Sequence, residues 1–228
     1  LVQVRGQFDN RYLIECVRRF PGRFSPIVVV DTDQPDAPQV LEQWVREGAE
    51  GVRLGPTVRS PGNDLLAIWR KAAELGLPVS SLGSFEGFTS VQFTQVVREF
   101  PSLPIIVEHL GGIGWDDAPP YAKFRQILAF AQYPNVYIKI HGLGEICPRP
   151  MPFPQPMRFP DVPPFIQMAY DAFGASRVMW GSDFPPVAAR EGYHNALAWT
   201  MEHLKCGSDD DQAWVFGKTA TSLFKFAG

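Results

Sequence analysis

The stretch Arg177-Val178-Met179-Trp180-Gly181-Ser182-Asp183-Phe184-Pro185-Pro186 decides how the rest of the chain is interpreted. Its apolar start predicts a short buried strand over residues 177–180, and the two prolines stop both strand and helix. Asp183 then lies just past the carboxyl end of that strand, where α/β barrels carry their chemistry. A carboxylate there suits a metal ligand or a proton acceptor, and capping of a turn or helix is the alternative.

Length and composition predict one domain over residues 1–228. The chain has 228 residues, of which 45% are hydrophobic, enough for the core of a single α/β barrel. Its net charge of −3 and the lack of a basic run argue against a nucleic-acid surface. Cys16, Cys147 and Cys206 are far apart and odd in number, which favours a reduced cytoplasmic protein. Neither a membrane span nor a signal peptide is predicted.

Strand and helix patterns alternate along the whole chain. Apolar, β-branched runs predict strands at residues 1–5, 26–30, 51–54, 77–82, 104–108, 136–140 and 177–180. Helical spacing predicts helices at 11–20, 38–47, 64–75, 90–100, 121–132, 163–173, 192–205 and 210–224. Asn10 is the expected cap of the first helix, and Gly48 and Gly76 are placed to end the second and third.

This alternation predicts a parallel sheet covered by helices. Both a closed barrel and an open doubly wound sheet fit, but no GxGxxG follows the first strand. A barrel gathers all strand ends at one mouth, and polar residues end or follow several strands: Arg5, Asp31, Arg53, His109, His141 and Asp183. We therefore predict a TIM (β/α)8 barrel, with seven of its eight strands present.

The longest link, residues 147–164, contains eight prolines and predicts neither helix nor central strand. Long loops in compact domains are usually functional or disordered. We expect a flap over the barrel mouth, with Phe153, Met157 and Phe159 facing the substrate. A flexible insertion is the alternative.

Two of the four histidines are candidates for chemistry. His109 and His141 each follow a predicted strand and precede glycine, whereas His194 and His203 lie in a closing helix and are expected to be structural. Together with Asp183, the two imidazoles suit a divalent transition metal with open positions. Metal-free acid–base chemistry is the alternative.

Three further residues are candidate substrate contacts. Arg53 ends a strand and could hold a substrate carboxylate, or form a structural ion pair with Glu50 or Asp31. Lys139 lies two positions before His141, on the same face of its strand, and needs a carboxylate partner or a shifted pKa if it is buried. Trp180 ends the strand that leads to Asp183.

Several stretches resemble one known family. They are Val107-Glu108-His109-Leu110-Gly111-Gly112, Asn135-Val136-Tyr137-Ile138-Lys139-Ile140-His141-Gly142-Leu143 and Trp180-Gly181-Ser182-Asp183-Phe184-Pro185, with Gly51-Val52-Arg53 and Phe216-Gly217-Lys218-Thr219-Ala220. They resemble the amidohydrolase-2 family of TIM-barrel hydrolases, which includes lactonases of pyrone-dicarboxylate and sugar lactones and, more distantly, a decarboxylase. The resemblance implies that His109 binds metal or substrate, that Asp183 binds metal and shuttles the proton of water, and that Arg53 contacts the substrate.

The sequence departs from that family at three points. The His-x-His of the first family strand is absent, so we expect that about one βα unit or more precedes Leu1 in the biological protein. The predicted strand at residues 77–82 ends without the histidine that relatives often carry. His141 stands where many relatives have serine, and could act as an additional acid, base or ligand.

These observations predict a metal-dependent hydrolase of a small, anionic lactone, ester or amide. Zinc or manganese would polarise the carbonyl, with His109 and Asp183 as ligands and His109, Asp183 and His141 as catalytic groups. Non-oxidative decarboxylation and a non-catalytic barrel are the alternatives. The expected partner is a small molecule, and a homo-oligomer is compatible with the sequence.

Overall fold

The computed structural model describes residues 1–148, 159 and 161–226. Its centre is a parallel sheet with the strand order β1-β2-β3-β4-β5-β6. The strands are β1 (Ile27–Val28), β2 (Gly51–Leu54), β3 (Val79–Ser81), β4 (Ile105–Val107), β5 (Val136–Ile140) and β6 (Val178–Trp180). Six of the seven predicted strands are therefore confirmed, in chain order and all parallel.

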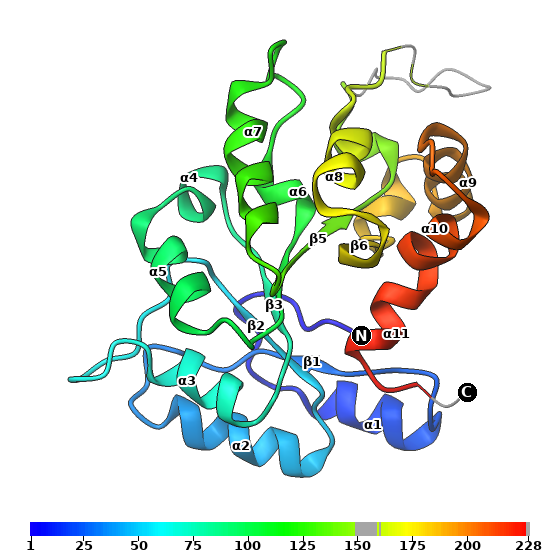
Figure 1. Ribbon diagram of the computed structural model, residues 1–228. Coiled ribbons are helices and arrows are strands. Elements are labelled where there is room, and N and C mark those ends of the chain that lie inside the picture. The colour runs from blue at the N-terminus through cyan, green and yellow to red at the C-terminus, as the bar shows by residue number, and fades with distance from the viewer. Residues whose placement is uncertain (149–158, 160, 227–228) are drawn as a thin grey trace.

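Helices cover the outside of this sheet (Figure 1). They are α1 (Arg11–Arg19), α2 (Ala37–Glu47), α3 (Ala67–Glu74), α4 (Phe85–Phe88), α5 (Val91–Glu99), α6 (His109–Gly112), α7 (Ala122–Leu128), α8 (Phe165–Phe173), α9 (Tyr193–His203), α10 (Asp209–Ala213) and α11 (Thr219–Leu223). Short 3₁₀ turns are η1 (Ala129–Gln132), η2 (Leu143–Glu145), η3 (Ala175–Arg177) and η4 (Pro186–Ala189), and η5 (Trp214–Lys218) is a π-helix. The predicted helix at 210–224 is thus divided into three pieces.

The two faces of the strands bury different side chains. Alternate residues such as Val52, Ile105 and Ile138 face the helices and join the large apolar core. The opposite positions face inward, where Ile27 and Met179 pack in a small separate cluster with Ile106 and Phe224. Because side chains alternate along a strand, this inner face also carries the polar residues nearer the carboxyl ends of the strands.

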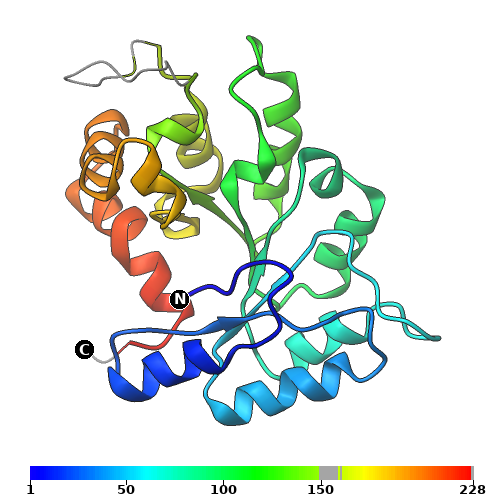
Figure 2. The same cartoon turned by 180° about the vertical axis from the view of Figure 1, so that it is seen from behind.

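The predicted strand at residues 1–5 is reduced to one isolated bridge. Val2 forms an isolated parallel bridge with Ile27, and the Gln3 amide donates to the Ile27 carbonyl at 2.9 Å. This segment lies beside β1 and close to α11 (Figure 2). Among the described residues β1 and β6 are the two edges of the sheet. A further βα unit before Leu1 stays a prediction.

Asn10 occupies the N-cap position of α1, as predicted, but its side chain bonds elsewhere. Its side chain makes no capping bond to α1. Instead Nδ2 donates to the Val29 carbonyl at 2.9 Å, and Oδ1 accepts from the Val29 amide at 3.1 Å. Gly48 does end α2 in a left-handed conformation, with φ of 117°, which glycine adopts without steric cost.

The predicted flap at residues 147–164 falls largely outside the described residues, including Phe153 and Met157. Phe159 is described, and its ring centroid lies 6.1 Å from that of Trp199 in α9. Across the described part of the chain, no helix is long and apolar enough to cross a bilayer.

Candidate active site

The carboxyl ends of β4, β5 and β6 bring His109, His141 and Asp183 together. His109 begins α6 one residue after Glu108, His141 directly follows β5, and Asp183 lies three residues past β6. The ring centroids of His109 and His141 are 4.2 Å apart, with the rings nearly parallel. His109 Nε2 lies 3.9 Å from Asp183 Oδ1. Three residues that are distant in the sequence therefore share one site.

The backbone at this site is held in unusual conformations. His109 and Asp183 have φ values of 52° and 51°, in the left-handed region that residues with a Cβ rarely adopt. Such conformations cost about 1 kcal/mol or more each and collect at functional sites. The fold therefore imposes the orientation of these two side chains against local preference.

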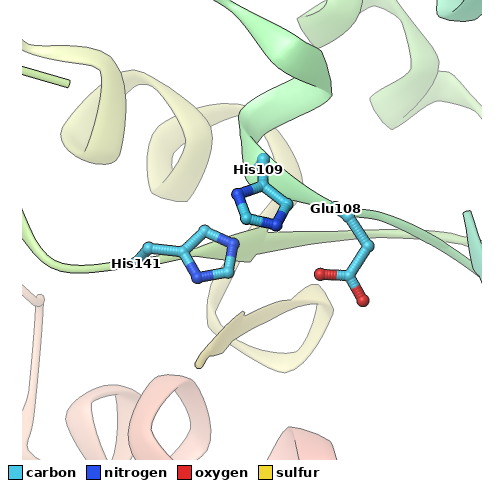
Figure 3. Close-up of side chains that lie close together, drawn as sticks. All are labelled: Glu108, His109 and His141. Carbon is cyan, nitrogen blue, oxygen red and sulfur yellow. The ribbon is translucent and has the colours of Figure 1, made fainter. Parts of the chain in front are cut away.

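His141, whose ring lies beside that of His109 (Figure 3), is held as a neutral imidazole. Its Nδ1 lies 3.0 Å from the Gly181 carbonyl oxygen, which fixes the proton on Nδ1 because a carbonyl only accepts. Burial lowers the pKa of His141 to about 4. Its Nε2 is buried and has no hydrogen-bond partner among the described residues, so a lone pair is available for a ligand.

Glu145 is a member of the site that sequence reasoning missed. It lies in η2, and its Oε1 pairs with His109 Nδ1. Burial is the largest single influence on His109 and lowers its pKa, but the hydrogen bond to Glu145 and the charges of Glu145, Glu108 and Asp183 together outweigh it and raise the pKa. Burial would raise the pKa of Glu145, yet the bond from His109 and the nearby positive charges hold it at about 2. The carboxylate therefore orients the imidazole ring.

Arg190 is a second missed residue. Its guanidinium, only 4% exposed, lies 3.0 Å from Asp183 Oδ2 and 3.6 Å from Glu145 Oε2. Burial, followed by the charge of Glu145, raises the pKa of Asp183 despite this ion pair. Arg190 follows η4, where no strand end marks it in the sequence.

A second set of charges lies on the inner face of the strands beside the histidines. Glu108 Oε1 accepts from Lys139 Nζ at 2.6 Å and from Ser80 Oγ at 2.5 Å, and Arg53 Nη2 lies 3.8 Å away. Burial would raise the pKa of Glu108, but Lys139 and Arg53 hold it at about 2. Glu108 is therefore the carboxylate that Lys139 was expected to need.

The alternative ion pair of Arg53 with Glu50 or Asp31 is wrong, because its carboxylate partner is Glu108. Glu50 instead accepts from Ser25 Oγ at 2.6 Å. Trp180 is not brought to the site: it packs against the outer core, with its ring centroid 5.8 Å from that of Tyr193 in α9.

The site fits a divalent metal. Two groups of three residues hold ligand atoms within 4.8 Å of one another: His109 with Glu145 and Asp183, and His109 with Glu108 and His141. Imidazole nitrogen and carboxylate oxygen are ligands of zinc and manganese. Buried Glu145 Oε2 and His141 Nε2 are without a hydrogen-bond partner in the described part of the chain. Glu108 Oε1 already accepts from Lys139 and Ser80, whereas Glu145 Oε2 accepts from no described residue, so the group with Glu145 and Asp183 fits better.

A parallel α/β sheet with carboxylates and imidazoles at its strand ends is typical of the active sites of α/β-barrel enzymes. The chain belongs to the amidohydrolase family, whose model matches residues 3–226. The resemblance predicted from the sequence is thereby confirmed, and the protein is a hydrolase. The six parallel strands and their alternating helices agree with the predicted TIM-barrel class.

Known proteins resemble this chain over most of its length. It is 27% identical to the L-fucono-1,5-lactonase of Burkholderia ambifaria over 241 residues, which cover 96% of this chain and 76% of that protein. A Pseudomonas putida protein provisionally assigned as a 2-pyrone-4,6-dicarboxylic acid hydrolase has a TM-score of 0.75 at 22% identity, covering 98% of this chain and 80% of its own. A zinc-bound amidohydrolase of Burkholderia multivorans has a TM-score of 0.72 at 18% identity, covering 99% and 82%. These two structures share the fold.

Proposed function

We propose that this protein hydrolyses the lactone ring of a small anionic substrate, using a divalent metal, zinc or manganese, at His109, Glu145 and Asp183. The observation that carries the proposal is that potential ligand atoms of these three side chains lie within 4.8 Å of one another at the carboxyl ends of the strands. The similarity to an L-fucono-1,5-lactonase supports a lactone as substrate.

The distribution of charge supports both the metal and the anion. On one side, the carboxylates of Asp183, Glu145 and Glu191 surround the guanidinium of Arg190, and this concentration of negative charge suits a metal ion. On the other side, Arg53 and Lys139 share one carboxylate, which leaves an excess positive charge. Arginine and lysine there suit a carboxylate or another anionic group of the substrate.

A metal at this site supplies Lewis-acid polarisation of the lactone carbonyl and lowers the pKa of water. Asp183 takes the proton of the attacking water and passes it to the ring oxygen as the C–O bond breaks, which yields the hydroxy acid. Its raised pKa brings this carboxylate nearer the pH at which a general base works well. Arg190 holds one oxygen of Asp183 in place, and Arg53 orients the anionic group.

Purified protein, metal analysis and a panel of lactones test this proposal. We expect stoichiometric metal and acid release from sugar 1,5-lactones or from 2-pyrone-4,6-dicarboxylate. Asp183→Asn should lower kcat by about 10²- to 10⁴-fold, the usual contribution of a general base. Asp171→Asn, an exposed carboxylate in α8, is the control and should leave kcat unchanged.

Product analysis separates the alternatives. Release of CO2 without ring opening would identify a decarboxylase. Lactone hydrolysis that survives Asp183→Asn would remove Asp183 from the mechanism. Binding of lactones without turnover, in protein that holds no metal, would indicate a non-catalytic barrel.

A further inference from the structure

The side chain of Glu191 lies buried between two loops of the site without belonging to either ligand group. It is 0% exposed, and its Oε1 accepts a hydrogen bond from the Gly144 amide at 3.1 Å. Its backbone is fixed as well, because Asn195 Nδ2 donates to the Glu191 carbonyl at 2.9 Å. The segment that precedes α9 is thereby joined to η2, which follows β5.

Two glycines make room for this carboxylate. A Cβ at Gly142 would lie 2.1 Å from Glu191 Oε1, and a Cβ at Gly144 would lie 2.0 Å from Oε2. Real Cβ atoms do not approach other atoms this closely. Neither glycine has a positive φ, so backbone conformation does not require glycine here. Glycine is required at both positions because the Glu191 carboxylate fills the space that a Cβ would need.

The position held in this way matters for the site, because Gly144 directly precedes Glu145. Glu145 pairs with His109 Nδ1 and contributes to the group of potential metal ligands. A shift of the Gly144 backbone would therefore displace Glu145 relative to His109. Displacements of about 1 Å in a catalytic site can cost about 10²-fold in rate.

The geometry points to Glu191 as a positioning residue that, seated in the notch formed by Gly142 and Gly144, sets the placement of Glu145 against His109. It acts through the backbone and does not touch the reacting atoms. The carboxylate of Glu191 also forms an ion pair with Arg190, the cation that Asp183 and Glu145 share: its Oε2 lies 3.8 Å from Arg190 Nε. The catalytic part of this inference rests on the proposed function, and the structural part does not.

Two double mutants test the packing of Glu191 against Gly142 and Gly144, because the two glycines differ in their surroundings. The three atoms nearest a Cβ at Gly144 all belong to Glu191. A Cβ at Gly142 also meets Ala196 Cβ at 2.7 Å. Glu191→Ala should therefore relieve the damage of Gly144→Ala and leave that of Gly142→Ala unrelieved. Gly217→Ala is the control, since a Cβ there meets nothing within 4 Å.

Backbone hydrogen exchange provides a readout that does not depend on the reaction. In Glu191→Ala we expect amide exchange at residues 142–146 to rise at least tenfold, with protection of the β strands unchanged. Glu191→Gln keeps an oxygen for the Gly144 amide and should retain most of the protection. Gly144→Ala should raise exchange in the wild-type background and cause little further change in the Glu191→Ala background.

Hydrolysis provides the second readout. Glu191→Ala should lower kcat about 10- to 100-fold with KM within about threefold, and Glu191→Gln should recover part of the loss. Unchanged exchange at residues 142–146, equal damage by Gly144→Ala in both backgrounds, or loss of protection throughout the sheet in both Glu191 variants would overturn the inference. If the wild-type protein opens no lactone, the exchange data still test whether Glu191 holds residues 142–146 in place. Failure of the proposed function and failure of this inference are therefore distinguishable.

Discussion

At the scale of single residues, Glu108 is a buried charge whose stability depends on its partners. Its side chain is 2% exposed and faces two cations, Lys139 and Arg53, that are themselves largely buried. A buried charge is tolerated when it is paired and hydrogen-bonded, and Glu108 meets both conditions through Lys139 and Ser80. Removing the carboxylate leaves the cations without compensation.

The variant Glu108→Gln should lower the free energy of unfolding by about 3 kcal/mol, because breaking a buried pair strands the remaining charge. Urea unfolding followed by tryptophan fluorescence measures this change. Glu202→Gln, on the exposed face of α9, is the matched control, with an expected change below about 0.5 kcal/mol. Equal stability of the two variants would mean that Lys139 and Arg53 are adequately solvated.

At the scale of elements, Asn10 shows how a loop side chain joins a helix to a strand. The residue is fully buried, and its amide bonds to the Phe8 carbonyl at 3.1 Å and to both backbone groups of Val29. The start of α1 is thereby fixed to the chain just past β1. Val29 lies beyond the last paired residue of β1, so Asn10 satisfies backbone groups that the sheet does not.

Asn10→Ala should destabilise the protein by about 2–3 kcal/mol, since each lost hydrogen bond contributes about 1 kcal/mol and leaves buried groups without partners. Thermal or urea unfolding measures the loss. Gln132→Ala, which removes one exposed side-chain bond to the Ala129 carbonyl, serves as the comparison and should change little. A loss below 1 kcal/mol for Asn10→Ala would show that water replaces these bonds.

At the scale of the whole molecule, the sheet separates two environments. Its outer face packs against helices in one continuous apolar core, and its inner face ends in charged and imidazole groups. The site is therefore built from groups that folding removes from water. This makes stability depend on pH, because the pKa values of these groups in the folded protein differ from those in the unfolded chain.

The metal-free protein should lose stability as the pH falls from about 6.5 towards 4. Burial holds the pKa of His141 near 4, against an ordinary value of 6.5. Within this window the unfolded chain binds a proton that the folded protein does not, so unfolding is favoured, by up to about 3 kcal/mol at pH 4. Above pH 6.5 neither state protonates this group, and its contribution is constant.

Urea unfolding in the presence of a chelator, at pH values from 8 to 4.5, measures this dependence. His141→Asn should flatten the curve below pH 6.5. His194→Asn, which changes an exposed histidine of α9, should leave the slope as in the wild type. Parallel curves for wild type and His141→Asn would contradict the assignment of His141 as a buried neutral base.

Local pattern accounts for most of what could be predicted. Period-2 and period-3.6 hydrophobicity marked six strands and the main helices, and the position after a strand marked His109, His141 and Asp183 as neighbours. The pattern was misleading at residues 1–5, where an apolar alternation forms only one bridge. Glu145, Arg190 and Glu191 could not be found in this way, because they lie in turns without periodicity.

The sequence by itself determined the order of parallel strands and helices, because the spacing of apolar side chains dictates which face of each element is buried. Only the tertiary structure decided which charges meet: Glu108 with Lys139, Glu145 with His109, and Arg190 with Asp183. These pairings depend on distances between neighbouring strands and loops at the carboxyl ends of the sheet, which packing of the whole sheet sets and local spacing does not specify.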